Sequence, residues 1–190
     1  MTDTRLVPEE AEELLRRFST ASPGWPLDDT TLEPVALTDR FRGSLLWGAV
    51  GDALGRPTEG RTWERIREKW GPEGVTDFHK WRGWRSGPIG TWTDDTQLTI
   101  EVAETILESG GHVDPERFSE RLCDWLPHGR GKGRATTAAV EALEAGTPWW
   151  EAGAEVDSAG NGAAMRAAPV GLAWALAPDA GPLVREAVLS

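Results

Sequence analysis

Two adjacent carboxylates, Asp94 and Asp95, lie between the hydroxyl groups of Thr93 and Thr96 at the start of an apolar helical pattern. Divalent cations such as Mg²⁺, Mn²⁺ and Ca²⁺ prefer oxygen ligands of this kind. The same residues also suit a helix cap, because Asp94 and Gln97 have the spacing of a capping box. One cap needs only one acceptor, and a second carboxylate adds repulsion that a cation would relieve. The segment therefore predicts either a capped helix or one face of a metal site.

A second pair of acidic residues lies in segment 48–59, which is rich in glycine. Asp52 is surrounded by apolar and glycine positions, so a buried carboxylate there must find hydrogen-bond donors or a cation. Glu59 follows the stiff residue Pro57, where it could enter a cleft as a metal ligand or as an acid–base group. The alternative for Glu59 is a solvated loop residue, because glutamate is seldom buried.

Glycines alternate with basic residues in segment 129–134, directly before a predicted helix. Backbone N–H groups of Gly131 and Gly133 can surround a phosphate at a helix N-terminus, with Lys132 between them. The segment lacks the Gly-Lys-[Ser/Thr] of a P-loop, and no strand precedes it. By spacing alone, a flexible basic loop explains these residues equally well.

A third unusual segment, 160–171, combines small residues with one arginine. Asn161 can cap a helix, and the alanines that follow leave a surface that packs tightly. Arg166 is the exception on this surface. It either pairs with an internal carboxylate such as Asp52 or contacts an anionic substrate.

Helices separated by glycine and proline must position these residues, and the sequence contains no convincing strand pair. The predicted fold is all-α, with an N-terminal extension over residues 1–38 and one domain over residues 39–190. Glycines at 43, 48, 51 and 55 weaken the first domain helix by roughly 1 kcal/mol each, which suggests close approach of another helix or a ligand. The expected helices cover residues 8–18, 39–54, 63–70, 93–109, 114–126, 135–145 and 161–176, and the region from Pro182 onward.

Composition narrows the classes of partner. The net charge of −11 argues against a nucleic acid binding face or an anionic membrane surface. No apolar run is long enough to span a bilayer, and the acidic start does not match a signal peptide, so a cytoplasmic location is expected. Cys123, the single cysteine, falls on an apolar helical face and is predicted to be a core thiol.

Three of these segments, in this order, resemble the ADP-ribosylglycohydrolase family, which includes the enzyme that reactivates dinitrogenase reductase. Segment 41–55 with Glu59 is similar to the family's first helix and flap glutamate. Segment 93–96 is similar to its first metal motif, and segment 160–166 to its later ligand-binding signature.

The resemblance implies a cleft with two metal ions, usually Mg²⁺ or Mn²⁺. Thr93, Asp94 and Asp95 would be metal ligands, and Glu59 a mobile ligand or acid–base group, which makes Glu59, Asp94 and Asp95 the candidate catalytic residues. The remaining residues that would line or support the ADP-ribose site are Trp92 as an apolar wall, Gly131 and Gly133 against the pyrophosphate, and Asn161, Gly162, Met165 and Arg166.

The resemblance covers residues 39–190, whereas the family ordinarily continues for roughly another hundred residues, which a domain of ordinary size accommodates. That continuation carries a second acidic motif, Asp-x-Asp-Thr. The chain is therefore expected to be a fragment, a natural split half that needs a second chain, or a truncated homologue. The expected function is hydrolytic removal of ADP-ribose from a modified side chain or small acceptor. The alternatives are an incomplete ADP-ribose-binding protein or another two-metal nucleotide hydrolase.

Overall fold

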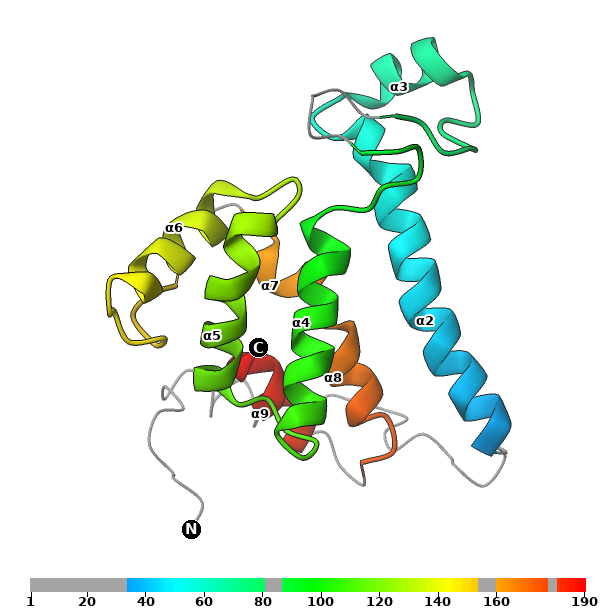
Figure 1. Cartoon of the computed structure of the whole chain (residues 1–190). Coiled ribbons are helices and arrows are strands. Elements are labelled where there is room, and N and C mark those ends of the chain that lie inside the picture. The colour runs from blue at the N-terminus through cyan, green and yellow to red at the C-terminus, as the bar shows by residue number, and fades with distance from the viewer. Residues whose placement is uncertain (1–33, 81–86, 154–159, 178–180) are drawn as a thin grey trace.

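The computed structural model describes residues 34–80, 87–153, 160–177 and 181–190 (Figure 1). Every regular element in these ranges is a helix, which confirms the predicted all-α class. The α-helices are α2 (Pro34–Gly55), α3 (Trp63–Trp70), α4 (Asp94–Glu108), α5 (Pro115–Trp125), α6 (Arg134–Glu144), α7 (Gly162–Met165), α8 (Ala168–Ala173) and α9 (Gly181–Leu189), and the short 3-10 turns are η2 (Arg56–Thr58) and η3 (Leu126–His128).

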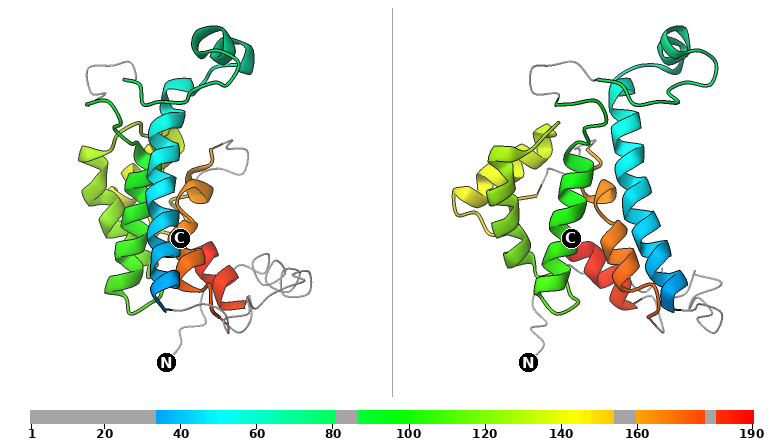
Figure 2. Two further views of the ribbon diagram at one scale, coloured as in Figure 1. Left: turned by 90° about the vertical axis from the view of Figure 1, so that its right-hand side faces the viewer. Right: turned by 45° about the vertical axis from the view of Figure 1, so that its right-hand side comes forward.

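Helix α4 occupies the centre of the fold (Figure 1). It packs against α5 on one side and against α2 and α8 on the other. Helix α6 lies beyond α5, and α3 lies past the C-terminal end of α2 (Figures 1 and 2). The N-terminus of α4, which carries the two predicted metal carboxylates, thus lies between α2 and the loop that joins α5 to α6.

The hydrophobic core is formed by the inner faces of α4, α5, α6 and α8. Leu98 and Val102 of α4 are fully buried, as is Val140 of α6. Burying a side chain of this size contributes about 1.5–3 kcal/mol. Cys123 packs against this core, and burial raises the pKa of its thiol, as expected of a core cysteine. The core thus fixes the part of α4 that directly follows the polar residues at its N-terminus.

Two expectations about helix boundaries were wrong. The first domain helix begins at Pro34 rather than near Asp39. The helix expected over residues 161–176 is divided into α7 and α8. Pro169 explains the division, because proline has no N–H and its ring obstructs a continuous helix, whereas it is tolerated in a first turn. The helix predicted over residues 8–18 lies outside the described residues.

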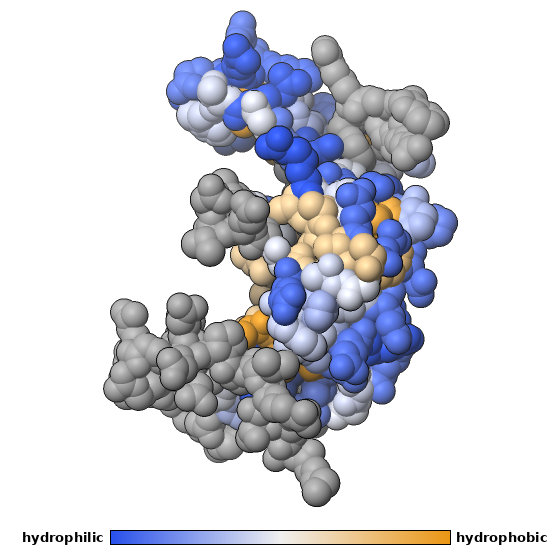
Figure 3. All heavy atoms as spheres, turned by 90° about the vertical axis from the view of Figure 1, so that its left-hand side faces the viewer, coloured by the Kyte–Doolittle hydropathy of each residue, from blue (hydrophilic) through white to orange (hydrophobic). Residues whose placement is uncertain are grey.

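The surface on the side of α6 is hydrophilic over much of its area, with apolar residues near its centre (Figure 3). Within the described part of the chain, no helix combines the length and the apolar character needed to cross a membrane.

Candidate functional site

Asp52 anchors the N-terminus of α4 to α2. Its carboxylate accepts hydrogen bonds from the backbone N–H of Thr93 at 2.8 Å and from that of Thr96 at 3.1 Å. It also accepts from the hydroxyls of Thr93 at 2.7 Å and Thr96 at 2.6 Å. The sequence predicts that a buried carboxylate at this position needs hydrogen-bond donors or a cation. The structure provides four donors, all from Thr93 and Thr96 at the start of α4. Asp52 was absent from the predicted site residues, although its place among glycines was a signal.

The predicted capping box between Asp94 and Gln97 is wrong. Thr93 is the N-cap residue of α4, and its hydroxyl accepts only a long hydrogen bond, 3.4 Å, from the N–H of Asp95. Gln97 instead binds the glycine loop, accepting from the N–H of Arg130 at 2.8 Å. The carboxylate of Asp52, from another helix, accepts from the N–H groups of Thr93 and Thr96, so these two donors need no local capping box.

The two adjacent carboxylates face different surroundings. Asp94 is buried, and its carboxylate accepts a hydrogen bond of 3.3 Å from the N–H of Gly133. Burial raises the pKa of Asp94 above its ordinary value, and the negative charge of Asp95 adds to this effect. The hydrogen bond from Gly133 and the positive charge of Arg56 act in the opposite direction. Asp95 is only partly buried and lines the open cavity beside α2.

A single hydroxyl group lies between two carboxylates in this cavity. Oγ1 of Thr93 is 2.7 Å from Oδ1 of Asp52 and 2.9 Å from Oδ2 of Asp95. A threonine hydroxyl has one hydrogen, so it can donate to only one of them at a time. Among the described residues, no three His, Cys, Asp or Glu side chains are grouped closely enough to hold a metal ion. In the described part of the chain, this cluster therefore consists of two carboxylates around one hydroxyl, without a third acidic, histidine or cysteine ligand.

The cavity above this cluster has a volume of about 580 Å³ and lies between α2, α4 and α7. It brings together five of the predicted site residues, Glu59, Thr93, Asp95, Asn161 and Met165, and adds Asp52 and Arg56. Glu59 is mostly exposed and forms an ion pair with Arg56, which places it at the rim. Asn161 occupies the N-cap position of α7, but its side chain makes no capping hydrogen bond.

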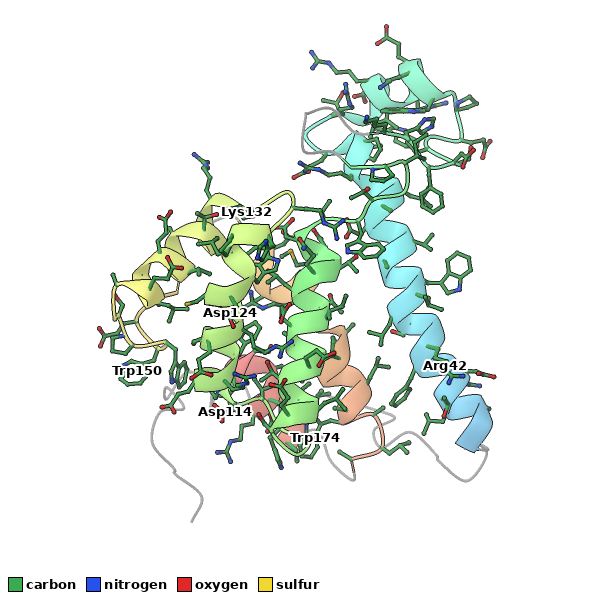
Figure 4. The ribbon with its side chains drawn as sticks, in the orientation of Figure 1. Arg42, Asp114, Asp124, Lys132, Trp150 and Trp174 are labelled. Carbon is green, nitrogen blue, oxygen red and sulfur yellow. The ribbon has the colours of Figure 1, made fainter. Side chains whose placement is uncertain are left out.

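A second cavity, of about 710 Å³, is formed by the glycine loop of residues 127–134 together with Arg56 and Glu59. Gly131 has a φ of 74°, a conformation that glycine adopts readily. A Cβ at this position would lie 3.0 Å from Oδ1 of Asp94. Lys132, at the upper end of α5 and α6 in Figure 4, donates to the carbonyl of Leu126 at 3.0 Å. Since Arg56 and Glu59 line both cavities, the acidic cluster and the basic loop border one another.

Three predicted ligand-binding residues, Trp92, Gly162 and Arg166, do not line either cavity. Trp92 is partly exposed, and the guanidinium of Arg130 lies 5.0 Å from the centre of its ring. Gly162 faces α6, where an added Cβ would lie 3.2 Å from the hydroxyl of Thr136.

Arg166 neither pairs with Asp52 nor reaches either cavity. Its Nε donates to the carbonyl of Ser190 at 2.9 Å, and its guanidinium lies 5.0 Å from the ring centre of Phe118. Burial lowers the pKa of Arg166. The suggested pairing with Asp52 is therefore wrong, because the four donors on α4 occupy that carboxylate. Arg166 directly follows Met165, which lines the first cavity.

Comparison with known proteins extends this description. The family model for ADP-ribosylglycohydrolase matches residues 33–190. A protein of Archaeoglobus fulgidus is 41% identical over 140 residues, which cover 73% of this chain and 44% of the relative. The ADP-ribosylarginine hydrolase Tri1 of Pseudomonas putida is 31% identical over 150 residues, covering 75% of this chain and 38% of the relative.

The ADP-ribosylhydrolase ARH3 of Xenopus tropicalis is 32% identical over 150 residues, which cover 74% of this chain and 41% of the relative. A solved structure named as an ADP-ribosylglycohydrolase-related protein complex has a TM-score of 0.62 and 36% identity, covering 80% of this chain and 49% of that one. The chain thus spans less than half the length of each of these relatives.

Proposed function

This chain belongs to the ADP-ribosylglycohydrolase family, and from that premise we propose that it carries the first half of a site that hydrolyses the bond between ADP-ribose and a modified protein side chain. The observation that supports this proposal is the cluster of Asp52, Thr93 and Asp95 on one side of a cavity. The glycine loop, with its backbone N–H groups and basic residues, lines an adjoining cavity that shares Arg56 and Glu59 with the first one.

The oxygen cluster fits a divalent metal ion in its chemistry. The hydroxyl of Thr93 has two carboxylate neighbours and one hydrogen, so a cation near Asp95 would offset charge that the hydroxyl alone leaves uncompensated. Thr93 and Asp95 would hold Mg²⁺ or Mn²⁺, joined by Asp94 if its side chain turns away from Gly133, and by Glu59 from the rim. Such a metal lowers the pKa of a bound water and orients hydroxyl groups of a substrate.

Two further tasks, proton transfer and binding of the pyrophosphate, would fall to other residues of the chain. Glu59, an exposed carboxylate at the border of both cavities, would accept or return the proton that hydrolysis requires. The N–H groups of the loop around Gly131 would bind the pyrophosphate of ADP-ribose, because backbone donors near a helix N-terminus favour anions. A carboxylate cluster and an anion-binding loop on adjoining cavities suit a substrate with a sugar at one end and phosphates beside it.

The direct test is release of ADP-ribose from ADP-ribosylated arginine and serine peptides in the presence of Mg²⁺ or Mn²⁺. We expect the double variant Asp94→Ala/Asp95→Ala to lose activity and cation-dependent binding of ADP-ribose. Asp124→Ala is the matched control, because Asp124 is an exposed acid on α5, away from both cavities (Figure 4). Equal turnover by the double variant and the wild type would refute the proposed site.

A second function remains, because the described residues do not form a complete ligand set for a metal ion. In that case the chain alone binds ADP-ribose without hydrolysing it, and turnover requires a second polypeptide. Calorimetric titration with ADP-ribose and Mn²⁺ separates these functions, since binding without product release supports the second one. Hydrolysis of free nucleotides in place of ADP-ribosylated peptides would instead assign the site to another class of two-metal hydrolase.

A further inference from the structure

Arg56 and Glu59 line both cavities, and each has the opposite charge to its neighbours in one of them. Among the described residues of the first cavity, Arg56 is the only basic side chain, beside the carboxylates of Asp52, Glu59 and Asp95. Among the described residues of the second cavity, Glu59 is the only carboxylate. The basic residues of that second cavity are Arg56, His128, Arg130, Lys132 and Arg134. The border between the cavities therefore holds one cation and one anion that form an ion pair.

The two partners of this ion pair differ in their exposure to solvent. The side chain of Arg56 is 23% exposed, whereas that of Glu59 is 62% exposed. Arg56 begins the turn η2, in which the next residue, Pro57, is buried and accepts a hydrogen bond from Nε of Arg61 at 3.1 Å. Burial raises the pKa of Asp94 and the positive charge of Arg56 opposes that rise, so Arg56 also lies near this carboxylate. Arg56 is thus held at the border, whereas the carboxylate of Glu59 meets it from the solvent side.

An anion in the second cavity would compete with Glu59 for the guanidinium of Arg56. An exposed ion pair contributes little stability, because water solvates both groups and salt screens them. A phosphate group accepts parallel hydrogen bonds from the planar guanidinium, and a pyrophosphate carries more negative charge than one carboxylate. The backbone N–H groups of the glycine loop favour the same anion. Glu59, displaced from the ion pair, still lines the first cavity, which contains Thr93 and Asp95.

We infer that Arg56 exchanges partners, binding a phosphate of the substrate in place of Glu59 and so releasing that carboxylate for the reaction in the first cavity. Arg56 is then a binding residue for the anion and a positioning residue for Glu59. A ligand without a phosphate leaves the ion pair intact, so the exchange selects for phosphate-bearing substrates. The exchange itself rests on the geometry of the two cavities, and only the use of the released carboxylate rests on the proposed function.

The test is binding of ADP to the full 190-residue chain, measured by isothermal titration calorimetry. ADP carries the pyrophosphate without a bond to be hydrolysed. A chelator removes divalent cations, so that Glu59 cannot act as a metal ligand, and about 0.3 M NaCl screens general charge repulsion. We expect Arg56→Gln to weaken ADP binding by about tenfold or more. Glu59→Gln should strengthen it by about two- to fivefold, because it frees the guanidinium.

Double variants separate competition for Arg56 from simple repulsion between Glu59 and the anion. In the Arg56→Gln background, Glu59→Gln should leave ADP binding unchanged, since there is no guanidinium to free. In the Arg134→Gln background it should still strengthen binding, because Arg134 lines only the second cavity. Arg56→Lys keeps the charge, so in that background Glu59→Gln should also strengthen binding, although loss of the planar guanidinium weakens ADP binding itself. The lysine variant also keeps the test valid if Arg56→Gln fails to fold.

Failure of the wild-type chain to bind ADP would overturn the inference. Unchanged ADP binding by Arg56→Gln would do the same, as would a gain from Glu59→Gln that is equal with and without Arg56. If ADP binding shows the expected coupling but the wild-type chain releases no ADP-ribose from modified peptides with Mg²⁺ or Mn²⁺, hydrolysis by this chain is refuted. The exchange of partners at Arg56 would then still stand.

Discussion

The carboxylate of Asp52 holds Thr93 by two hydrogen bonds, one to its backbone N–H at 2.8 Å and one to its hydroxyl at 2.7 Å. The two residues are 41 positions apart in the sequence and belong to different elements. This contact joins α2 to the first turn of α4, and it orients the segment that carries both adjacent carboxylates. The position of Asp94 and Asp95 therefore depends on an aspartate from another helix.

Asp52→Ala should lower the free energy of unfolding by about 2–4 kcal/mol, because it removes an acceptor with four donors. Asp52→Asn should lose roughly half as much, since its amide oxygen still accepts. Urea unfolding measures both. Asp114→Ala is the control, because Asp114 caps α5 with its own side chain and should cost only about 1 kcal/mol. Equal losses for Asp52→Ala and Asp114→Ala would contradict the anchoring role.

Gly131→Ala should disturb the acidic cluster as well as strain the loop. The added Cβ would lie 3.0 Å from Oδ1 of Asp94 and 3.2 Å from Cβ of Thr93, at a φ of 74°. We expect a loss of stability of about 1–2 kcal/mol and at least tenfold weaker binding of ADP-ribose in the presence of Mn²⁺. Gly146→Ala has a similar φ of 89° but no described neighbour within 4 Å, so it should lose stability alone. Unchanged binding of ADP-ribose by Gly131→Ala would show that the glycine loop does not contribute to the binding site.

Gln97→Leu should loosen the glycine loop without unfolding the protein. The side chain of Gln97 accepts from the N–H of Arg130 and donates to the carbonyl of His128. Losing these bonds should cost about 1 kcal/mol and accelerate amide hydrogen exchange at Arg130. Gln97→Glu retains an acceptor for that N–H and should protect it nearly as well as the wild type. Similar exchange rates at Arg130 in the wild type and Gln97→Leu would argue against this anchor.

Asp94 should make the metal-free protein less stable as pH rises. Burial raises the pKa of this carboxyl in the folded state above its unfolded value, so the folded state binds the proton more tightly. The stabilisation is complete below the unfolded pKa and is lost as pH increases through the folded pKa. Asp94→Asn removes this dependence and should melt at a higher temperature at pH 7. Thermal melts from pH 3 to pH 8 with a chelator provide the measurement, and identical pH profiles for both proteins would refute the assignment.

Helices with a clear apolar period and local start and stop signals were predictable from the sequence. The predicted limits of the helix over 63–70 agree with the structure, and those of the helix over 93–109 differ by one residue at each end. The apolar period and the start and stop residues that mark both helices lie within a few residues of one another in the sequence. The break at Pro169 was also readable in principle, because proline interrupts a helix wherever its N–H would be needed.

The pairings within the site could not be predicted in the same way. Asp52 was expected to need donors, Gln97 to complete a cap and Arg166 to pair with a carboxylate. Their partners lie 44, 33 and 24 positions away in the cases of Thr96, Arg130 and Ser190. The residue type shows that a buried charged or polar group needs a hydrogen-bond partner. Tertiary packing decides which partner lies within reach.

The sequence by itself determined the helical class, most helix positions and the set of oxygen and glycine residues from which a site can be built, because these follow from local periodicity and side-chain chemistry. The tertiary structure alone decided that Asp94 faces the glycine loop while Asp95 faces the cavity. Adjacent residues at the start of a helix point about 100° apart. Which of them meets solvent therefore depends on where α2 and the loop pack against α4.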